Sequence, residues 1–452
     1  MSKNAFTMNL SQVAETLKAQ YSGSDVHVEG ISTDSRSLQG GELFIALRGD
    51  NFDGNKFAVQ AIEHGAVACV LEYPVEGVER AIIVENTRKA LADLAKAWRR
   101  QFSIPVIAVT GSNGKTTVKE MITSILAQQG NVLSTQGNLN NDIGVPLTLF
   151  RLDRQHDSAV IEMGANHPGE IAYLVDIVEP DVGIVNNAAA AHLEGFGSLE
   201  GVARTKGEMF AGLNEEATAV INADDDFSTL WDDMAGSHHK IHFALNNKDR
   251  AEVSADWQVG AEGSHVTVTS SEMAFDFHLA LPGKHNVMNA LAAIAATLSV
   301  NVPVSAIVAG LEKMQPVKGR LQLKPGIGGS RILDDTYNAN PASLGVALDV
   351  LKCYPGEHFL ALGDMGELGK NSQTLHAEAG KQARQSGVSR LFTLGPLSVY
   401  AAEAFGKGAN NYQDHAEMID ALNKQLNSNI TLLVKGSRSM HMEKIVNAVS
   451  AG

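Results

Sequence analysis

Short apolar runs alternate with amphipathic stretches along most of the chain, and this alternation is typical of buried parallel strands covered by helices. Residues 104–110 form one such run, and beyond it apolar side chains recur at helical spacing up to Gly130. Further apolar runs, each followed by polar residues, lie at 158–163, 182–187 and 217–222. The pattern predicts an α/β protein built from repeated units of strand, loop and helix.

The same pattern divides the chain into three predicted domains. Residues 1–102 mix short strands with helical stretches, as in a small α/β domain. Residues 103–316 contain the repeated units of a central parallel sheet, then an alternation between 253 and 281 that predicts antiparallel strands at its edge. After a break at 316–319, a third set of apolar runs predicts a second doubly wound, Rossmann-like sheet over 317–452.

Composition narrows the classes of function. The 452 residues are 44% hydrophobic and 19% charged, and the formal net charge of -15 argues against a nucleic-acid partner. The two cysteines, Cys69 and Cys353, have neither metal-ligand nor disulfide spacing, so we expect a reducing, cytoplasmic setting. The start of the chain lacks the apolar core of a signal peptide, and no apolar stretch is long enough to span a bilayer. We therefore expect no membrane insertion.

The turn after the strand at 104–110 reads Thr-Gly-Ser-Asn-Gly-Lys-Thr-Thr. Its glycines allow a tight turn whose amide N–H groups can surround a phosphate, while the lysine adds a positive charge and the next threonine hydroxyl suits Mg2+. The common phosphate loop has a glycine where this chain has Val109, but the strand before the turn and the helix after it predict a P-loop-type site for a nucleoside triphosphate. The predicted ATP-binding residues of the turn are Gly111, Ser112, Asn113, Gly114, Lys115, Thr116 and Thr117.

Polar side chains gather where the predicted strands end, and ligands of open parallel sheets bind beyond these carboxyl ends. Glu162 ends its strand and could hold Mg2+ together with Thr116, or instead cap a helix or pair with a lysine. His192 follows another strand on a loop bounded by glycines, which fits a catalytic or ligand role as well as a structural one. Lys206 on its own predicts only a solvated lysine at the start of a helix.

The turn at 110–117 resembles the ATP loop of the Mur ligases, the enzymes that build the peptide of bacterial cell-wall precursors. Further motifs similar to those of that family follow in order at 137–146, 162–167, 186–197, 283–286, 334–341 and 435–439. The resemblance covers essentially the whole chain. Within the family, Asp-Thr-Tyr-Asn-Ala-Asn-Pro at 335–341 is similar to the members that add the dipeptide D-alanyl-D-alanine to UDP-N-acetylmuramoyl-tripeptide.

The resemblance implies a monomeric, ATP-dependent amide-bond ligase that works through an acyl phosphate. It implies an N-terminal domain for the UDP-sugar, a central ATPase domain and a C-terminal domain that brings the incoming amine. It also implies two Mg2+ ions, one held by Thr116 and Glu162, the other by His192 and a carbamylated Lys206. The catalytic residues it implies are Lys115, Glu162, His192 and Lys206.

The resemblance implies further contacts for each ligand. Asn286 would contact adenine, with Arg320 and Asp335 near the ribose and phosphates of ATP. The UDP-sugar would meet Ser35, Asn138 and Asn140. The contributions expected from the C-terminal domain to substrate binding come from Asn338, Asn340, Lys435 and Arg438.

Other classes of protein share parts of this pattern. A diamino-acid-adding Mur ligase or a folylpolyglutamate synthetase would have the same ATP loop, although the Asp-Asn-Pro-Arg motif expected of the former is absent from this chain. A regulatory phosphate-loop protein would hydrolyse a triphosphate without needing an amine or a carboxylate substrate. A sugar-nucleotide-binding protein with a vestigial ATPase is a third alternative.

Overall fold

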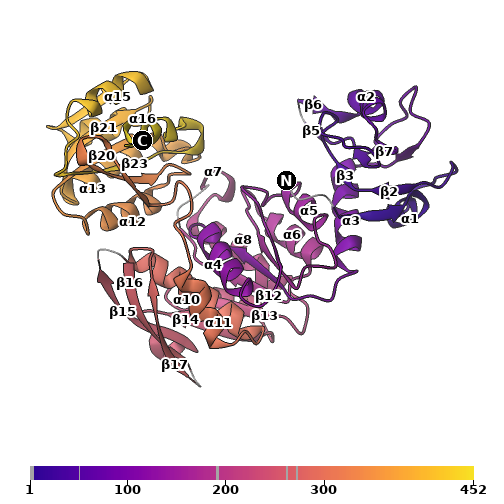
Figure 1. Ribbon diagram of the computed structural model, residues 1–452, viewed down its shortest axis with the longest axis horizontal. Helices are drawn as coiled ribbons and strands as arrows, with labels where there is room; N and C mark the ends of the chain where they lie inside the picture. Colours follow the sequence, from indigo (N-terminus) through magenta and orange to yellow (C-terminus); the bar gives the residue numbers. More distant parts are fainter. Residues whose placement is uncertain (1–4, 50, 190–192, 261–262, 271–272, 452) are drawn as a thin grey trace.

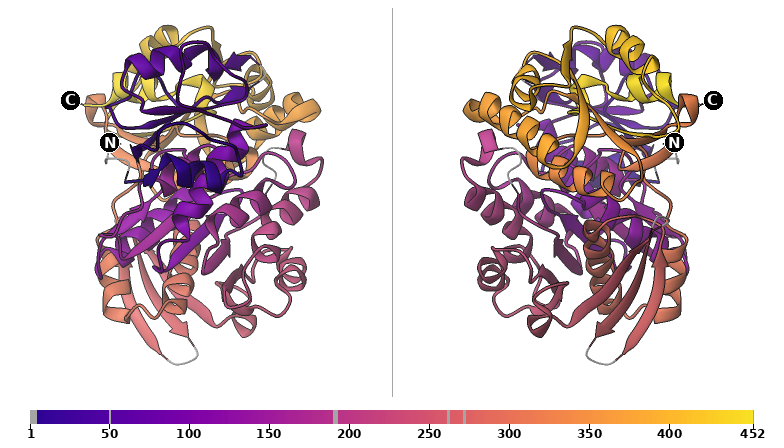
Figure 2. Two further views of the ribbon diagram at one scale, coloured as in Figure 1. Left: turned by 90° about the vertical axis from the view of Figure 1, so that its right-hand side faces the viewer. Right: turned by 90° about the vertical axis from the view of Figure 1, so that its left-hand side faces the viewer.

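The computed structural model describes residues 5–49, 51–189, 193–260, 263–270 and 273–451. The chain forms three α/β domains arranged as a U, with the N-terminal and C-terminal domains on the two arms and the central domain at the base (Figure 1). Turning the molecule shows both arms on the same side of the central domain (Figure 2).

The N-terminal domain is built on a small parallel sheet with the strand order β3-β4-β7-β8. The strands of this sheet are β3 (Ile31–Ser32), β4 (Leu43–Ile45), β7 (Ala68–Leu71) and β8 (Ala81–Ile83). Two short antiparallel pairs flank it, β1 (Thr7–Asn9) with β2 (His27–Glu29) and β5 (Arg48–Gly49) with β6 (Phe52–Asp53). The helices are α1 (Leu10–Thr16), the 3-10 turn η1 (Gly54–Phe57), α2 (Ala58–Glu63) and α3 (Thr87–Arg99).

Helix α3 joins the N-terminal domain firmly to the central one. The Asn86 side chain caps its first turn by accepting a hydrogen bond from the Lys89 amide, and its apolar side chains face inward. At its end, Trp98 packs against Phe6 with ring centroids 5.2 Å apart, and its indole N–H donates to the carbonyl of Leu152 at 3.0 Å. Buried residues of both domains consequently belong to one hydrophobic cluster.

The central domain contains a nine-stranded sheet with the order β10-β11-β9-β12-β13-β14-β15-β16-β17. Its strands are β9 (Val106–Thr110), β10 (Val132–Ser134), β11 (Ser158–Glu162), β12 (Val182–Val185), β13 (Thr218–Asn222), β14 (His239–Ala244), β15 (Val253–Gly260), β16 (Gly263–Ser270) and β17 (Ala274–Leu279). The pairs up to β15 are parallel, and the last two are antiparallel, as the alternation between residues 253 and 281 predicts.

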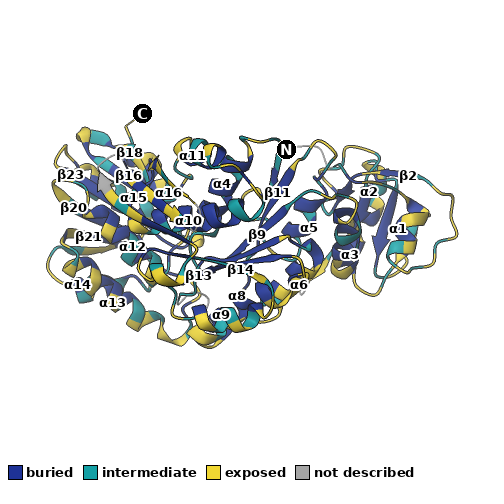
Figure 3. Cartoon of the chain, turned by 90° about the horizontal axis from the view of Figure 1, so that it is seen from below, coloured by how far each residue is buried: buried dark blue, intermediate teal, exposed yellow. Residues whose placement is uncertain are grey.

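Helices cover both faces of this sheet, so that β9 is buried along its whole length (Figure 3). Helix α4 (Lys115–Leu126) packs on one face with α10 (Lys284–Ser299) and α11 (Val304–Glu312). The other helices of the domain are α5 (Gly144–Leu149), α6 (Glu170–Val178), α7 (Leu193–Phe196), α8 (Leu199–Ala211), α9 (Ser228–Ala235) and the 3-10 turn η2 (Lys248–Arg250). All of these helices from α5 to α9 contribute to the cluster shared with the N-terminal domain.

The C-terminal domain has a six-stranded sheet with the order β18-β19-β23-β20-β21-β22, in which only the edge strand β18 runs antiparallel. Its strands are β18 (Gln322–Pro325), β19 (Arg331–Asp335), β20 (Glu357–Gly363), β21 (Val388–Leu394), β22 (Ala409–Tyr412) and β23 (Ile430–Lys435). The helices are α12 (Pro341–Leu351), α13 (Ser372–Gln385), α14 (Val399–Phe405), α15 (His415–Asn423) and α16 (Glu443–Val449), with 3-10 turns η3 (Ile327–Gly329), η4 (Gly369–Asn371) and η5 (Arg438–Met440). Separate hydrophobic clusters cover the two faces of the sheet.

A short linker between α11 and β18 connects the central and C-terminal domains. Two of its residues have left-handed backbone angles, Gly319 with φ of 71° and Leu321 with φ of 51°. All strands of any one sheet lie within a single predicted domain. The exact boundaries between the three domains stay predictions. No helix in the described parts of the chain is long and apolar enough to cross a membrane.

Candidate functional site

A cavity of about 680 Å³ lies between the central and C-terminal domains, a volume typical of ligand sites. Central-domain loops after β9, β11 and β12 form one side, and the carboxyl ends of β19 and β23 with the start of α12 form the other. The predicted site residues that line it are Gly111, Ser112, Asn113, Gly114, Lys115, Thr117, Asn138, Asn140, Glu162, Lys206, Asn286, Arg320, Asp335, Asn338, Asn340 and Lys435. Residues more than 300 positions apart in sequence therefore share one cavity.

Both glycines of the predicted phosphate loop adopt backbone angles that other residues avoid. Gly111 has φ of 145° and Gly114 has φ of 80°. A Cβ atom at Gly114 would lie 2.5 Å from both the Asn186 Nδ2 and the Asn289 Oδ1 atoms. The loop therefore needs glycine for its backbone and for the close approach of these two asparagines.

Asparagines at the end of β12 hold the loop in shape. The backbone amide of Asn113 donates to Asn187 Oδ1 at 2.9 Å, and that of Ser112 donates to the carbonyl of Asn187 at 3.0 Å. Asn186 Nδ2 donates to Asn289 Oδ1 at 2.8 Å and to the carbonyl of Asn113 at 3.0 Å. The sequence placed Asn186 and Asn187 at a strand end, but nothing in it indicated this supporting role.

Helix α4 starts at Lys115, and the residue before it, the N-cap Gly114, has no side chain to cap the first amides. The first amides of a helix have no partner inside the helix, and their partial positive charge attracts anions. Because the Ser112 and Asn113 amides already donate to Asn187, the first turn of α4 is the part of the loop that suits a phosphate best.

Lys115 folds back over the loop, where its Nζ donates to the carbonyls of Gly111 at 2.6 Å and Ser112 at 3.3 Å. Burial lowers the pKa of Lys115, and the nearby Glu162 carboxylate opposes that shift. The ammonium group thus rests on neutral carbonyls that an oxyanion can replace as its partner. A phosphate would offer the lysine a charged acceptor in place of these neutral ones.

Glu162 is held by both of its carboxylate oxygens. Thr116 Oγ1 donates to Glu162 Oε2 at 2.9 Å, and Asn140 Nδ2 donates to Glu162 Oε1 at 2.8 Å. The carboxylate is 2% exposed, so these bonds replace the water that it would otherwise bind. Arg320 Nη2 donates to the same threonine hydroxyl at 2.9 Å. Asn140, expected to contact the UDP-sugar, therefore faces the Glu162 carboxylate.

The donor set at Thr116 and Glu162 fits Mg2+. A hydroxyl and a carboxylate oxygen 2.9 Å apart are hard ligands at a spacing suited to neighbouring positions around a small cation. The described residues contain no group of three or more His, Cys, Asp and Glu side chains arranged to hold a metal. Mg2+ takes few protein ligands and completes its shell with phosphate oxygens and water, so one hydroxyl and one carboxylate are a sufficient protein donor set for it.

Lys206 lies in the middle of α8 and is only 2% exposed, so the expectation of a solvated lysine at a helix start is wrong. Its Nζ is 3.4 Å from the carbonyl oxygen of Ala165 and 5.3 Å from the centre of the Phe196 ring. Burial is the main cause that lowers the pKa of Lys206 to about 7, with Lys115 adding to the shift. Helix α8 thus presents a buried amine whose charged form is disfavoured. His192, the other residue of the predicted second metal site, lies outside the described residues.

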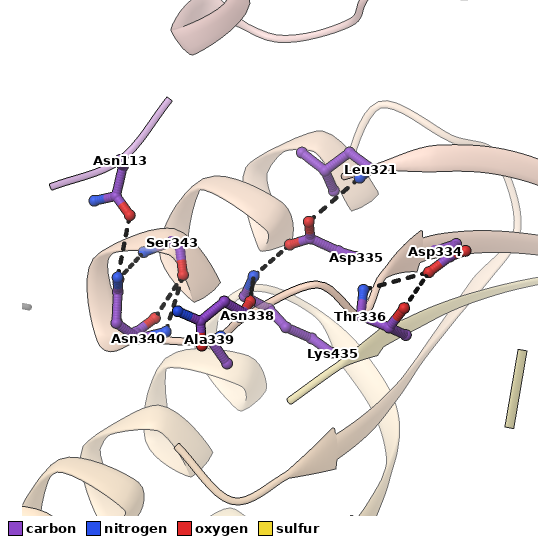
Figure 4. A network of polar contacts seen from close by, with 10 residues as sticks. All are labelled: Asn113, Leu321, Asp334, Asp335, Thr336, Asn338, Ala339, Asn340, Ser343 and Lys435. Atoms are coloured by element: carbon purple, nitrogen blue, oxygen red, sulfur yellow. Dashed lines mark hydrogen bonds and ion pairs between the residues drawn. The ribbon is translucent and has the colours of Figure 1, made fainter. Parts of the chain in front are cut away.

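Two charged side chains from neighbouring strands meet on the C-terminal side of the cavity (Figure 4). Lys435, at the end of β23, places its Nζ 2.5 Å from Asp335 Oδ2, at the end of β19, and donates to the carbonyl of Asn338 at 2.9 Å. Asp335 Oδ1 accepts from the Leu321 amide at 3.3 Å, which ties the pair to the linker. The nearby Arg320 guanidinium stacks 4.2 Å from the centre of the Tyr337 ring.

Three predicted contacts have local partners of their own. Asn286, in the first turn of α10, lines the cavity and donates to the carbonyl of Pro282 at 2.8 Å. Ser35 is buried in the N-terminal domain, where its hydroxyl donates to Gln60 Oε1 at 3.3 Å. Arg438 is largely exposed and pairs with Glu443 at 3.4 Å. Ser35 and Arg438 therefore do not line the main cavity.

Comparisons with known proteins agree with this arrangement. The profile of the Mur ligase middle domain matches residues 109–297, that of the Mur ligase glutamate ligase domain matches 319–438, and that of the Mur ligase family catalytic domain matches 27–99. The UDP-N-acetylmuramoyl-tripeptide--D-alanyl-D-alanine ligase of Escherichia coli (strain K12) is 43% identical over 445 residues, 98% of each chain.

Solved structures extend the likeness to the whole fold. A crystal structure of MurF from Acinetobacter baumannii has a TM-score of 0.92 at 33% identity, covering 98% of this chain and 99% of that one. MurF from Thermotoga maritima, solved in complex with ADP, has a TM-score of 0.82 at 27% identity, with 92% and 96% covered.

The fold, the phosphate loop and these relatives define an ATP-dependent ligase of three α/β domains. The chain belongs to the Mur ligase family. The predicted family and fold class, with its central phosphate-loop domain and Rossmann-like C-terminal domain, are confirmed.

Proposed function

We propose that this chain joins D-alanyl-D-alanine to UDP-N-acetylmuramoyl-tripeptide at the expense of ATP, giving the UDP-N-acetylmuramoyl-pentapeptide precursor of peptidoglycan, ADP and phosphate. The observation that carries the proposal is the shared cavity, in which the phosphate loop, Glu162 and Lys206 face Asp335 and Lys435 of another domain. The relative from Escherichia coli, 43% identical over its whole length, supports the choice of substrates.

The reaction would pass through two transfers. The terminal carboxylate of the tripeptide attacks the γ-phosphorus of ATP, forming an acyl phosphate and releasing ADP. The free amine of the dipeptide then attacks the acyl carbon, an amide bond forms, and phosphate leaves with the former carboxylate oxygen. Little covalent chemistry falls to the protein in such transfers, so its side chains act by positioning and by offsetting charge.

The phosphate loop would carry the first transfer. Lys115 would exchange the Gly111 carbonyl, 2.6 Å away, for an oxygen of the transferring phosphoryl group. The first amides of α4 would bind the neighbouring phosphate oxygens. Thr116 and Glu162 would hold one Mg2+, whose charge offsets that of the phosphates. On the adenine side, Asn286 would contact the base, and Arg320 and Asp335 would lie near the ribose and phosphates.

Lys206 would serve the reaction as a carbamate. Its neutral amine attacks CO2, a nitrogen–carbon bond forms and a proton is released, so a cationic side chain becomes an anionic oxygen ligand. The buried position supports this, because a pKa near 7 leaves a large share of the amine neutral under ordinary conditions. With His192, the carbamate would hold a second Mg2+.

The C-terminal domain would deliver the dipeptide and exclude water. An acyl phosphate hydrolyses readily, so a domain that covers the phosphate loop protects the intermediate. Asn338, Asn340, Lys435 and Arg438 are the residues proposed to contribute to substrate binding there. Ser35, Asn138 and Asn140 are proposed for the UDP-sugar side. We further propose a cytoplasmic setting, which the two free cysteines favour, and a monomer, which the family resemblance implies.

The test is phosphate release by the purified protein with Mg-ATP, UDP-N-acetylmuramoyl-tripeptide and D-alanyl-D-alanine, omitting each component in turn. We expect release only in the complete mixture, together with a product heavier than the tripeptide substrate by one dipeptide residue. Release without the dipeptide would favour a regulatory ATPase. Release supported only by a different amine or carboxylate would move the chain to a sibling ligase.

A further inference from the structure

Asn113 has a side chain that the phosphate loop does not need for its own shape. Its backbone amide donates to Asn187 Oδ1 at 2.9 Å, and its carbonyl accepts from Asn186 Nδ2 at 3.0 Å and Asn187 Nδ2 at 3.1 Å. Both backbone groups are therefore fixed by the end of β12. The Asn113 carboxamide instead faces the C-terminal domain (Figure 4).

Asn340 meets it from the other side. As the N-cap of α12, Asn340 accepts the Ser343 amide on Oδ1 at 2.8 Å, and its own amide donates to Ser343 Oγ at 3.0 Å. This capping box fixes which end of the carboxamide faces the helix and leaves Nδ2 directed outward. Nδ2 donates to Asn113 Oδ1 at 3.1 Å, across the boundary between the two domains.

A hydrogen bond from Arg320 Nη2 to Thr116 Oγ1 at 2.9 Å also joins the C-terminal domain range to the phosphate loop, but no shared hydrophobic core of described residues does. None of the hydrophobic clusters among the described residues combines buried side chains of the central and C-terminal domains, whereas the N-terminal and central domains share one. Helix α12 is itself anchored in the C-terminal core through Leu344 and Leu348. A bond made by its N-cap residue, Asn340, therefore acts on the whole domain that carries Asp335 and Lys435.

We propose that Asn340 is a positioning residue that latches the C-terminal domain onto the phosphate loop through Asn113. The latch places Asp335 and Lys435 against the loop in the closed arrangement, and it opens when the domain moves away. Asn340 thereby acts through Asn113 and helix α12, in addition to any contact with substrate. The kinetic part of its test rests on the proposed function, and the scattering part does not.

Three variants isolate the bond. Asn113→Ala removes the acceptor while keeping the backbone bonds to Asn186 and Asn187. Asn340→Ser keeps a good helix cap, because serine caps about as well as asparagine, but its hydroxyl is too short to reach Asn113. The double variant, Asn113→Ala with Asn340→Ser, completes a double-mutant cycle. Asn86→Ser is the matched control, since Asn86 caps α3 by the same type of bond, from the Lys89 amide at 2.9 Å, away from the domain contact.

The measurements are kcat/KM for D-alanyl-D-alanine and the radius of gyration by small-angle X-ray scattering with Mg-ADP bound. Loss of one neutral hydrogen bond predicts a decrease in kcat/KM of about five-fold in each single variant. We expect the double variant to show the same decrease, because both changes break one bond. We also expect a larger radius of gyration in all three than in wild type and Asn86→Ser.

Decreases that multiply in the double variant, or single variants that match wild type, would overturn the latch. If the wild-type protein fails to use the dipeptide, the proposed function fails, and scattering alone then decides. In that case equal radii of gyration for wild type, Asn113→Ala and Asn340→Ser would overturn the latch independently of the reaction.

Discussion

Replacing Lys206 by methionine should make the protein more stable while it removes activity. The lysine is 2% exposed, and among the described residues its Nζ meets the carbonyl oxygen of Ala165 at a long 3.4 Å and the Phe196 ring at 5.3 Å. Methionine has a similar length and no charge to desolvate, so it fits the same space between α8 and Phe196. A buried charged group that activity requires often lowers the stability of the fold, so its removal can raise stability while activity is lost.

The size of the effect follows from the pKa of Lys206, which burial lowers from 10.5 to about 7. Each unit of difference between the pKa in the folded and in the unfolded chain corresponds to about 1.36 kcal/mol. At pH 7, folding must therefore either remove the proton of Lys206 or bury its charge, which lowers the free energy of unfolding by about 4 kcal/mol. The cost is greatest below pH 7, falls to about 2 kcal/mol at pH 9 and vanishes above 10.5, where the unfolded chain has lost the proton too. Lys206→Met should recover these amounts.

The assay is urea unfolding in buffer free of CO2 and nucleotide, at pH 7 and pH 9. Fluorescence of Trp231 reports on the right region, because its indole N–H donates to the carbonyl of Ala203 in α8. Lys119 is an equally buried control that bonds the carbonyl of Thr135 at 2.8 Å and pairs with Glu120, so Lys119→Met should destabilise the protein. A Lys206→Met protein no more stable than wild type at pH 7, or a gain that is the same at both pH values, would refute the reasoning.

Three further predictions concern turnover and nucleotide binding. Lys206→Ala should be nearly inactive and partly rescued by a short carboxylic acid; an active variant, with unmodified lysine in the wild-type mass spectrum, would contradict the carbamate. Lys115→Ala should lower kcat by about 100- to 1,000-fold, and near-normal turnover would exclude the loop from the mechanism. Gly114→Ala should weaken ATP binding in calorimetry, since its Cβ would collide with Asn186 at 2.5 Å. Gly387→Ala, with a similar φ of 85° and open space around it, should bind ATP normally.

The phosphate loop could be predicted from the sequence because every property it needs is local. Strand β9 is apolar throughout, Gly111 and Gly114 supply the positive φ angles, and α4 begins at the next residue. Polar residues at strand ends likewise indicated the rim of the cavity, since parallel strands bring their carboxyl ends to one edge. The same reasoning predicted the sheet of the C-terminal domain, and in the structure Asp335 and Lys435 lie at the carboxyl ends of its strands β19 and β23.

The supporting contacts could not be predicted, because they join residues with no local signal. Asn186 and Asn289 are 103 positions apart, and only the packing of α10 beside β12 brings them together. The bond from Asn140 Nδ2 to Glu162 had no signal in the sequence either, while the contact of Asn140 with the UDP-sugar stays a prediction. Lys206 looked like a surface lysine, because the groups that its side chain meets, the Phe196 ring and the loop after β11, lie outside its own helix.

The most direct test of the account follows oxygen from one substrate into one product. The terminal carboxylate of UDP-N-acetylmuramoyl-tripeptide is labelled with 18O, and the phosphate released with ATP and D-alanyl-D-alanine is analysed by mass spectrometry. An acyl phosphate formed from that carboxylate predicts one 18O atom in each phosphate released together with pentapeptide product. Unlabelled phosphate would show that ATP hydrolysis in this cavity is separate from amide-bond formation, and would contradict the account.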